Sequence, residues 1–148
     1  MADKPSAIDG LRESVYSRIE PMGFSRCPTL ALGKYPTTDK PSVQVLCPGV
    51  SQGVIRPKPG GMVHRLVTFQ ILVLYPIKAG SNDDQFAAIE RLMEQTDDLL
   101  QTQASDNFQP FVHYLNFVDS NYQIQGGTHL LGTLTYTTQV YRAVSANA

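Results

Sequence analysis

The sequence has little net charge, few cysteines and no long apolar run, and each shortage excludes a class of protein. Its 148 residues carry 12 basic and 13 acidic side chains, a formal net charge of −1, so no general attraction to nucleic acid or to anionic membrane is expected. The longest apolar run, Ile71–Tyr75, is too short to span a bilayer. The start, Met1–Pro5, is polar and no apolar segment follows it, so we expect no signal peptide and assembly in a cytoplasm.

Cysteine is also scarce. Cys27 and Cys47 are the only two, and each precedes a proline. Two cysteines in a chain of this length do not make a disulfide framework. They can pair with each other, or they can serve as two small buried apolar side chains at strand ends, which is the interpretation that we favour.

Motifs that carry catalytic or metal chemistry are missing as well. The histidines, His64, His113 and His129, stand at no spacing from one another or from a cysteine that makes a metal pair. There is no H-E-x-x-H, G-x-S-x-G or S-x-x-K, and no phosphate-binding glycine signature. Folding could bring a cysteine and a histidine together, but any chain with these residues allows that. We therefore expect no catalytic residue, no cofactor and no metal, and a protein that is not an enzyme.

Two segments have the apolar periodicity of amphipathic helices. In residues 6–20 the apolar residues recur at spacings of three and four, and Pro21 and Gly23 end the helix. This stripe consists of Ile8, Leu11, Val15 and Ile19. A second helix begins at Ser81 and runs to about Leu100, with acidic residues in the first turn, where the helix dipole favours them. Its apolar stripe consists of Phe86, Ile89, Leu92, Met93, Leu99 and Leu100.

Two segments, Met62–Tyr75 and Leu130–Arg142, alternate as unusually long strands. At about 3.3 Å per residue the first spans roughly 46 Å, against a diameter of roughly 38 Å for a compact domain of this length. A strand that outruns its own domain needs another surface to cover it, so the pattern indicates a subunit of an assembly. Shorter strands are predicted at Thr29–Lys34, Ser42–Leu46 and Phe111–Val118, with a loop at Asp119–Gly127.

Residues 47–61 form the longest loop that the sequence predicts. Three prolines and four glycines in 15 residues argue against a regular element. The loop contains the apolar pair Val54 and Ile55, followed by Arg56 and Lys58, its only charged residues. We expect this loop to be mobile in the isolated subunit and to become ordered in the assembly.

Charge is segregated along the chain. The second helix carries Glu90, Glu94, Asp97 and Asp98 against one base, Arg91, whereas Arg56, Lys58 and Arg65 lie in or beside the long loop. The acidic face is either solvated or a docking surface for a basic partner. The basic residues are solvated, part of an interface, or a small DNA contact. We predict a head-to-tail contact between subunits that joins the two, with apolar cover over Leu66, Leu72 and Leu74.

The order and character of these elements resemble the tail terminator proteins of long-tailed bacteriophages. The resemblance runs from about Ser6 to Arg142. Three segments carry it: the helix Ala7–Glu20 that ends at Pro-Met-Gly, the strand Leu66–Tyr75 that leads through Pro76 to the helix Gln85–Leu100, and the end Gly-Thr-Leu-Thr-Tyr-Thr-Thr-Gln-Val-Tyr-Arg.

The resemblance implies a virion protein of the tail or neck that is assembled in the host cytoplasm. Such subunits form a ring, typically of six, on the last ring of the tail tube. The ring ends tube polymerisation, meets the head connector, and in contractile tails can contact the sheath. DNA at most passes through the ring lumen, and no membrane is involved.

We therefore predict one α+β domain over residues 1–148, with a mixed, mainly antiparallel sheet, two helices packed on it, and flexible ends at about 1–5 and 144–148. The predicted function is that of a tail terminator-like subunit. One alternative is a head–tail joining protein, a connector or stopper. Another is a small enzyme or ligand-binding domain with its site between the sheet and the long loop.

Overall fold

The computed structural model describes residues 7–52, 62–77, 82–107 and 112–143. The predicted flexible ends and residues 53–61 of the predicted loop lie outside the described residues. In chain order, the elements are α1 (Ala7–Ile19), η1 (Glu20–Met22), β1 (Ser25–Arg26), η2 (Leu30–Leu32), β2 (Ser42–Gln52), β3 (Met62–Pro76), α2 (Asn82–Asn107), β4 (Val112–Gln125) and β5 (His129–Ala143).

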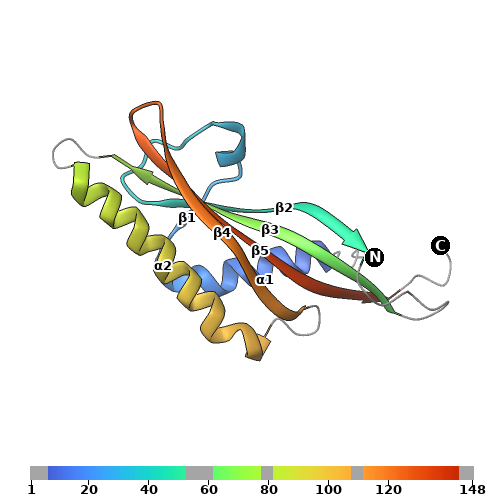
Figure 1. Cartoon of the computed structure of the whole chain (residues 1–148). Coiled ribbons are helices and arrows are strands. Elements are labelled where there is room, and N and C mark those ends of the chain that lie inside the picture. Colours follow the sequence, from blue (N-terminus) through green and yellow to red (C-terminus); the bar gives the residue numbers. More distant parts are fainter. Residues whose placement is uncertain (1–6, 53–61, 78–81, 108–111, 144–148) are drawn as a thin grey trace.

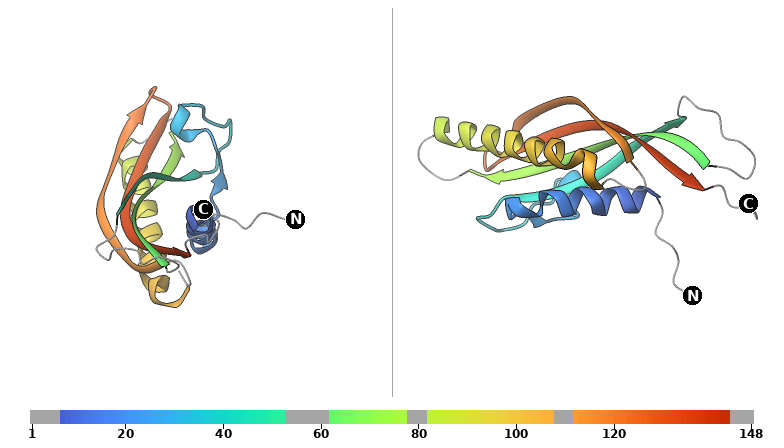
Figure 2. Two further views of the ribbon diagram at one scale, coloured as in Figure 1. Left: turned by 90° about the vertical axis from the view of Figure 1, so that its right-hand side faces the viewer. Right: turned by 90° about the horizontal axis from the view of Figure 1, so that it is seen from below.

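The five strands form one sheet in the order β1-β2-β3-β5-β4. The two-residue strand β1 runs parallel to β2, and the other neighbouring pairs are antiparallel. Both helices lie on the same face of this long, twisted sheet (Figure 1), and they run side by side when the molecule is seen from below (Figure 2). The predicted fold class, α+β with a mainly antiparallel mixed sheet and two packed helices, is confirmed.

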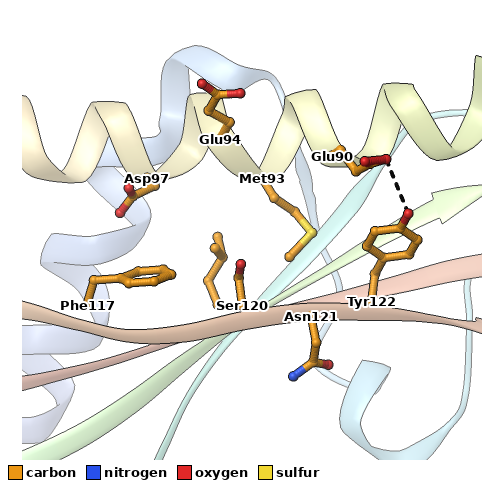
Figure 3. A pocket seen from close by; sticks show the side chains of 9 residues that line it. Glu90, Met93, Glu94, Asp97, Phe117, Ser120, Asn121 and Tyr122 are labelled. Carbon is orange, nitrogen blue, oxygen red and sulfur yellow. Dashed lines mark hydrogen bonds between the residues drawn. The ribbon is translucent and has the colours of Figure 1, made fainter.

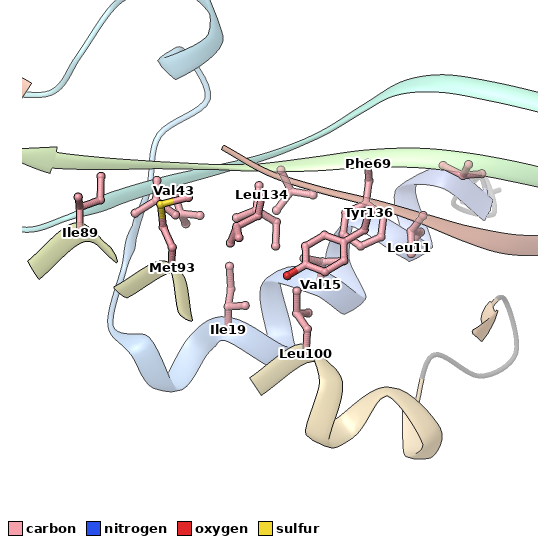
Figure 4. Close-up of a cluster of buried hydrophobic side chains, with 14 of the residues drawn as sticks. Leu11, Val15, Ile19, Val43, Phe69, Ile89, Met93, Leu100, Leu134 and Tyr136 are labelled. Atoms are coloured by element: carbon pink, nitrogen blue, oxygen red, sulfur yellow. The ribbon is translucent and has the colours of Figure 1, made fainter. Parts of the chain in front are cut away.

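The core lies between the helices and one face of the sheet, as the alternation in β3 and β5 predicts (Figure 4). From α1, the stripe Leu11, Val15 and Ile19 is buried against it. The strands and α2 contribute further buried residues: Val67, Phe69, Ile71, Val73, Ile89, Met93, Leu100, Leu130, Leu134, Tyr136 and Val140. Burial of apolar area on this scale is the main stabilising contribution to such a domain.

A second, smaller apolar cluster covers one end of the opposite sheet face. Leu72 and Leu74 of β3 are buried there under Cys27 and Leu30. The predicted strand Thr29–Lys34 is wrong, because the chain makes the 3-10 turn Leu30–Leu32 instead. Gly33 ends the turn with φ of 76°, and the Thr29 hydroxyl donates to the carbonyl of Lys34 at 2.8 Å. These local bonds compete with strand pairing.

β2 and β4 are longer than the sequence predicts. β2 continues past a bulge between Leu46 and Gly49 to Gln52, so the prediction that residues 47–61 form no regular element is wrong for 47–52. β4 continues to Gln125, so the loop predicted at Asp119–Gly127 shrinks to a tight turn with positive φ at both of its glycines. In each case a long neighbouring strand supplies ladder hydrogen bonds, and a bulge absorbs the irregular residues.

Candidate interaction site between α2 and β4

A groove with a volume of about 390 Å³ lies between α2 and the edge strand β4 (Figure 3). The helical period places four residues of α2 along it, because positions i, i+3, i+4 and i+7 share one side of a helix. They are Glu90, Met93, Glu94 and Asp97. From the sheet come Phe117, Ser120, Asn121, Tyr122 and Leu134.

A bulge in β4 gives the groove its sheet wall. Strict alternation would place Phe117 and Ser120 on opposite faces of the strand. The register shifts between Phe117 and Asp119, however, so that Phe117 lies opposite Tyr136 and Ser120 lies opposite Leu134, both residues of the core face. Phe117, Ser120 and Tyr122 therefore all belong to the sheet face that α2 covers.

Two of the carboxylates are held by tyrosine hydroxyls. Tyr136 donates to Oδ1 of Asp97 at 2.6 Å, and Tyr122 donates to Oε2 of Glu90 at 3.2 Å. Gln101 also donates to Oδ1 of Asp97, at 3.4 Å. The other oxygen of each carboxylate, Oδ2 of Asp97 and Oε1 of Glu90, accepts no hydrogen bond from the residues that the structure describes.

The electrostatics of the groove keep both tyrosines protonated. Burial raises the pKa of Tyr136, and the hydrogen bond to Asp97 and the negative charge of that carboxylate raise it further. The pKa of Tyr122 is raised by desolvation first and then by Glu90. Both hydroxyls therefore act as donors that fix the two carboxylates.

Apolar surface continues from the groove along β4. Phe117, Val118 and Ile124 are 43%, 49% and 54% exposed, and the other large exposed apolar residues in the described part of the chain are Leu32 and Val50. A smaller hollow of about 170 Å³ lies next along the same seam, with Ile124 on its wall. The rings of Phe86 and Tyr122 stack with their centres 6.1 Å apart. Tyr122 lines the groove, and Phe86 lines the smaller hollow.

The predicted acidic residues divide between the groove and the open surface. Asp97 and Glu90 line the groove, and Glu94 lines its rim with its carboxylate directed away from β4 (Figure 3). Asp98 is exposed and does not line the groove. The sequence analysis missed Phe117 and Tyr122. Two aromatic rings in a polar segment were the available signal, but the prediction of a loop after Val118 hid their shared face.

Of the predicted basic and apolar interface residues, the structure describes only those on β3. Val54, Ile55, Arg56 and Lys58 lie outside the described residues. On β3, Arg65 and Leu66 are half-buried.

The expected cover over the β3 leucines needs a correction. Leu72 and Leu74 are only 6% and 1% exposed, because the chain's own residues 27–35 cover them. They offer no free surface to a neighbouring subunit. Of the three leucines predicted to meet a partner, only Leu66 keeps part of its surface.

Cys27, Cys47 and His129 do not line the groove. Both cysteines are free; Cys27 is buried and Cys47 is half-buried. Burial raises the pKa of Cys47, although the nearby Arg12 lowers it. His129 packs its ring 5.1 Å from that of Tyr35, and burial lowers its pKa. Within the described ranges, no three histidine, cysteine or acidic residues gather as a metal site would require.

No protein-family model and no curated protein matches this chain. Within the described residues, no helix combines the length and the apolar character that crossing a membrane requires. The proposal about function therefore rests on the open edge strand β4, the order of the elements and the chemistry of the groove.

Proposed function

We propose that this chain is a tail terminator-like virion subunit, which forms a ring at the head-proximal end of a phage tail, ends tube polymerisation and joins tail to head. The observation that carries the proposal is the open edge at β4. This strand of 14 residues has β5 on one side and no strand on the other within the described part of the chain. A long edge with exposed apolar side chains is a surface that needs a partner.

The opposite edge of the sheet is blocked against strand addition from Ser42 to Pro48 of β2. β1 pairs only with Ser42 and Val43 of β2. Beyond it, the Tyr16 hydroxyl accepts the backbone N–H of Val45 at 2.9 Å, and Pro48 has no N–H to offer. On this proposal the open edge meets a different surface of its neighbour. Repetition of such a heterologous contact closes into a ring where the rotation per subunit divides a full turn.

The remaining parts of the proposal come from the resemblance. Of the elements on which the resemblance rests, the first helix, the long strand, the acidic helix and the two last strands follow in the same order in the fold, whereas a 3-10 turn replaces the first short strand. The resemblance also supplies the proposed partners. They are other copies of this chain in a ring, typically of six, the tail tube, the head connector and, in contractile tails, the sheath. On this proposal the protein is not an enzyme and needs no cofactor.

The test uses the purified full-length chain and the tail-tube protein encoded in the same genome. Light scattering and negative-stain electron microscopy should show closed rings. Added to polymerising tube protein, these rings should sit at one end of each tube and shorten the mean tube length. A chain that stays monomeric at high concentration and leaves tube length unchanged overturns the proposal.

The groove itself favours a second candidate, a ligand-binding domain, because a volume of about 390 Å³ falls in the range of small-molecule pockets. A monomeric chain whose melting temperature rises with a small organic cation would support this candidate. Rings that bind the head connector but not the tube would instead indicate a head–tail joining protein.

A further inference from the structure

We propose that the groove between α2 and β4 receives residues 54–58 of a second copy of this chain, with the Arg56 side chain directed to the carboxylate of Glu90. The inference rests on the proposed function, since it names the contact that would close the ring. The groove is the acceptor, and the segment Val54-Ile55-Arg56-Pro57-Lys58 is its occupant.

The groove is acidic and the segment is basic, so their charges are complementary. Glu90 and Asp97 each keep one oxygen that accepts no hydrogen bond from the described residues, and Glu94 adds a third negative charge at the rim. None of the described residues that line the groove is basic. An arginine presents several N–H donors in a planar fork, which suits carboxylate oxygens, and its aliphatic stem packs well against rings such as Phe117 and Tyr122.

The groove and the segment also have complementary apolar parts. The smaller hollow beside the groove, with exposed Ile124 on its wall, needs apolar cover. Val54 and Ile55 directly precede Arg56, so a single extended segment can present both chemistries. Elsewhere in the sequence no five consecutive residues combine two adjacent aliphatic residues with two basic ones. The two prolines of residues 57–59 favour an extended backbone, which suits docking beside an open strand.

Covalent reach excludes the same contact within one chain. Tyr122, which bonds Glu90, lies opposite Gly132 of β5. Gln52 pairs with Arg65, which pairs with Val140 of β5. Gly132 and Val140 are eight residues apart, about 26 Å along the strand, and three strand spacings add about 14 Å across the sheet. Four residues from Gln52 reach at most about 14 Å, and an extended arginine side chain adds about 7 Å. Arg56 therefore cannot reach Glu90 of its own chain, and the proposed contact is intermolecular.

A mixed-cysteine experiment tests the contact directly. One preparation carries Ser120→Cys in the groove, and another carries Lys58→Cys in the segment. After mixing and mild oxidation, covalent dimers should form in the mixture and in neither preparation alone. The control replaces Ser120→Cys with Asp98→Cys, which is on the same helix but outside the groove, and should give no dimer with Lys58→Cys. Absence of the dimer, or equal dimer with the control, overturns the inference.

Charge exchange gives an independent measurement. Arg56→Glu should raise the concentration for half-assembly about tenfold at low salt. Adding Glu90→Lys to this variant should recover much of that loss, whereas adding Asp98→Lys should not. Unchanged assembly of Arg56→Glu, or equal recovery by both lysines, contradicts the proposed pairing.

The two proposals fail in different ways. Rings without the Ser120–Lys58 crosslink would support the ring function and overturn this contact. The crosslink in open chains or dimers without rings would support this contact and overturn the ring function. Monomers that give no crosslink overturn both.

Discussion

Tyr136 shows how one side chain serves the core and the groove together. Its ring is fully buried and stacks on Phe69 with ring centres 5.2 Å apart, while its hydroxyl donates to Asp97, which lines the groove. A buried hydroxyl without a partner is costly, so the carboxylate stabilises the core residue and the hydroxyl orients the carboxylate.

Replacing Tyr136 by Phe should lower the free energy of unfolding by about 1.5–3 kcal/mol, because a hydrogen bond to a charged acceptor is lost. Urea unfolding of the two proteins measures the difference. Tyr122→Phe is the matched control, since its hydroxyl also bonds a carboxylate but from a less buried ring, and its loss should be smaller. A larger loss of unfolding free energy for Tyr122→Phe than for Tyr136→Phe would contradict the stabilising role of the bond between Tyr136 and Asp97.

Gly132 is a second residue whose identity the packing decides. A Cβ added there would lie 2.6 Å from the sulfur of Met93, so the methionine would have to move. We expect Gly132→Ala to destabilise the protein by about 1–2 kcal/mol through overpacking. Combined with Met93→Ala, the loss should be smaller than the sum of the two single losses, as a double-mutant cycle can measure. Strict additivity would contradict the contact.

At the scale of elements, the segment from Cys27 to Tyr35 acts as a small cover over one end of the sheet. It buries Leu72 and Leu74, and the Gln44 side chain ties it down through Ala31 N–H at 2.8 Å and the carbonyl of Pro28 at 2.7 Å. This cover explains why β3 can be apolar on both faces without exposing those leucines to solvent.

Two residues of η2 provide a matched pair for testing the cover. Leu30 is 1% exposed and Leu32 is 72% exposed, in the same turn. Leu30→Ala should cost about 2–4 kcal/mol of unfolding free energy through lost burial and a cavity. Leu32→Ala should stay within about 0.5 kcal/mol. Equal effects of the two changes would show that the segment does not stabilise the sheet.

His129 should make this end of the sheet sensitive to pH. Burial beside Tyr35 lowers its pKa from the ordinary value of 6.5, so the folded protein binds a proton less readily than the unfolded chain. The stability that results is present above pH 6.5 and is lost as the pH falls below that value. The urea midpoint of His129→Gln should therefore change less than that of the native chain between about pH 7.5 and about pH 5. Parallel changes in the two proteins would assign the pH dependence to other groups.

At the scale of the whole molecule, the difference between the two sheet edges should determine how copies assemble. Val118, 49% exposed on the open edge, is predicted to be a contact residue, whereas the exposed Leu32 lies outside the proposed interface. Val118→Lys should leave the unfolding midpoint nearly unchanged, as surface substitutions usually do. It should raise the concentration for half-assembly about tenfold through a charge on the covered edge. Leu32→Lys should leave assembly unchanged; if it weakens assembly as much as Val118→Lys, the contact lies elsewhere.

The sequence by itself determined the elements whose side chains keep a regular period. The apolar stripe of α1, the stripe of α2 and the alternation in β3 and β5 each follow from local spacing, and these faces form the core. The fold class follows from them, because two amphipathic helices and alternating strands must bury their apolar faces against one another.

Only the tertiary structure decided the irregular strands and the groove. The bulges in β2 and β4 break the strand period of two, so the local spacing of side chains predicts loops there. The chain forms strands instead, because the long neighbouring strands β3 and β5 supply backbone hydrogen bonds. The groove combines Glu90 and Asp97 with Phe117 and Tyr122, which α2 and β4 contribute from distant parts of the sequence. Residues so far apart share a site only because the crossover from β3 through α2 places β4 beyond β5 at the edge of the sheet, and no local pattern records that placement.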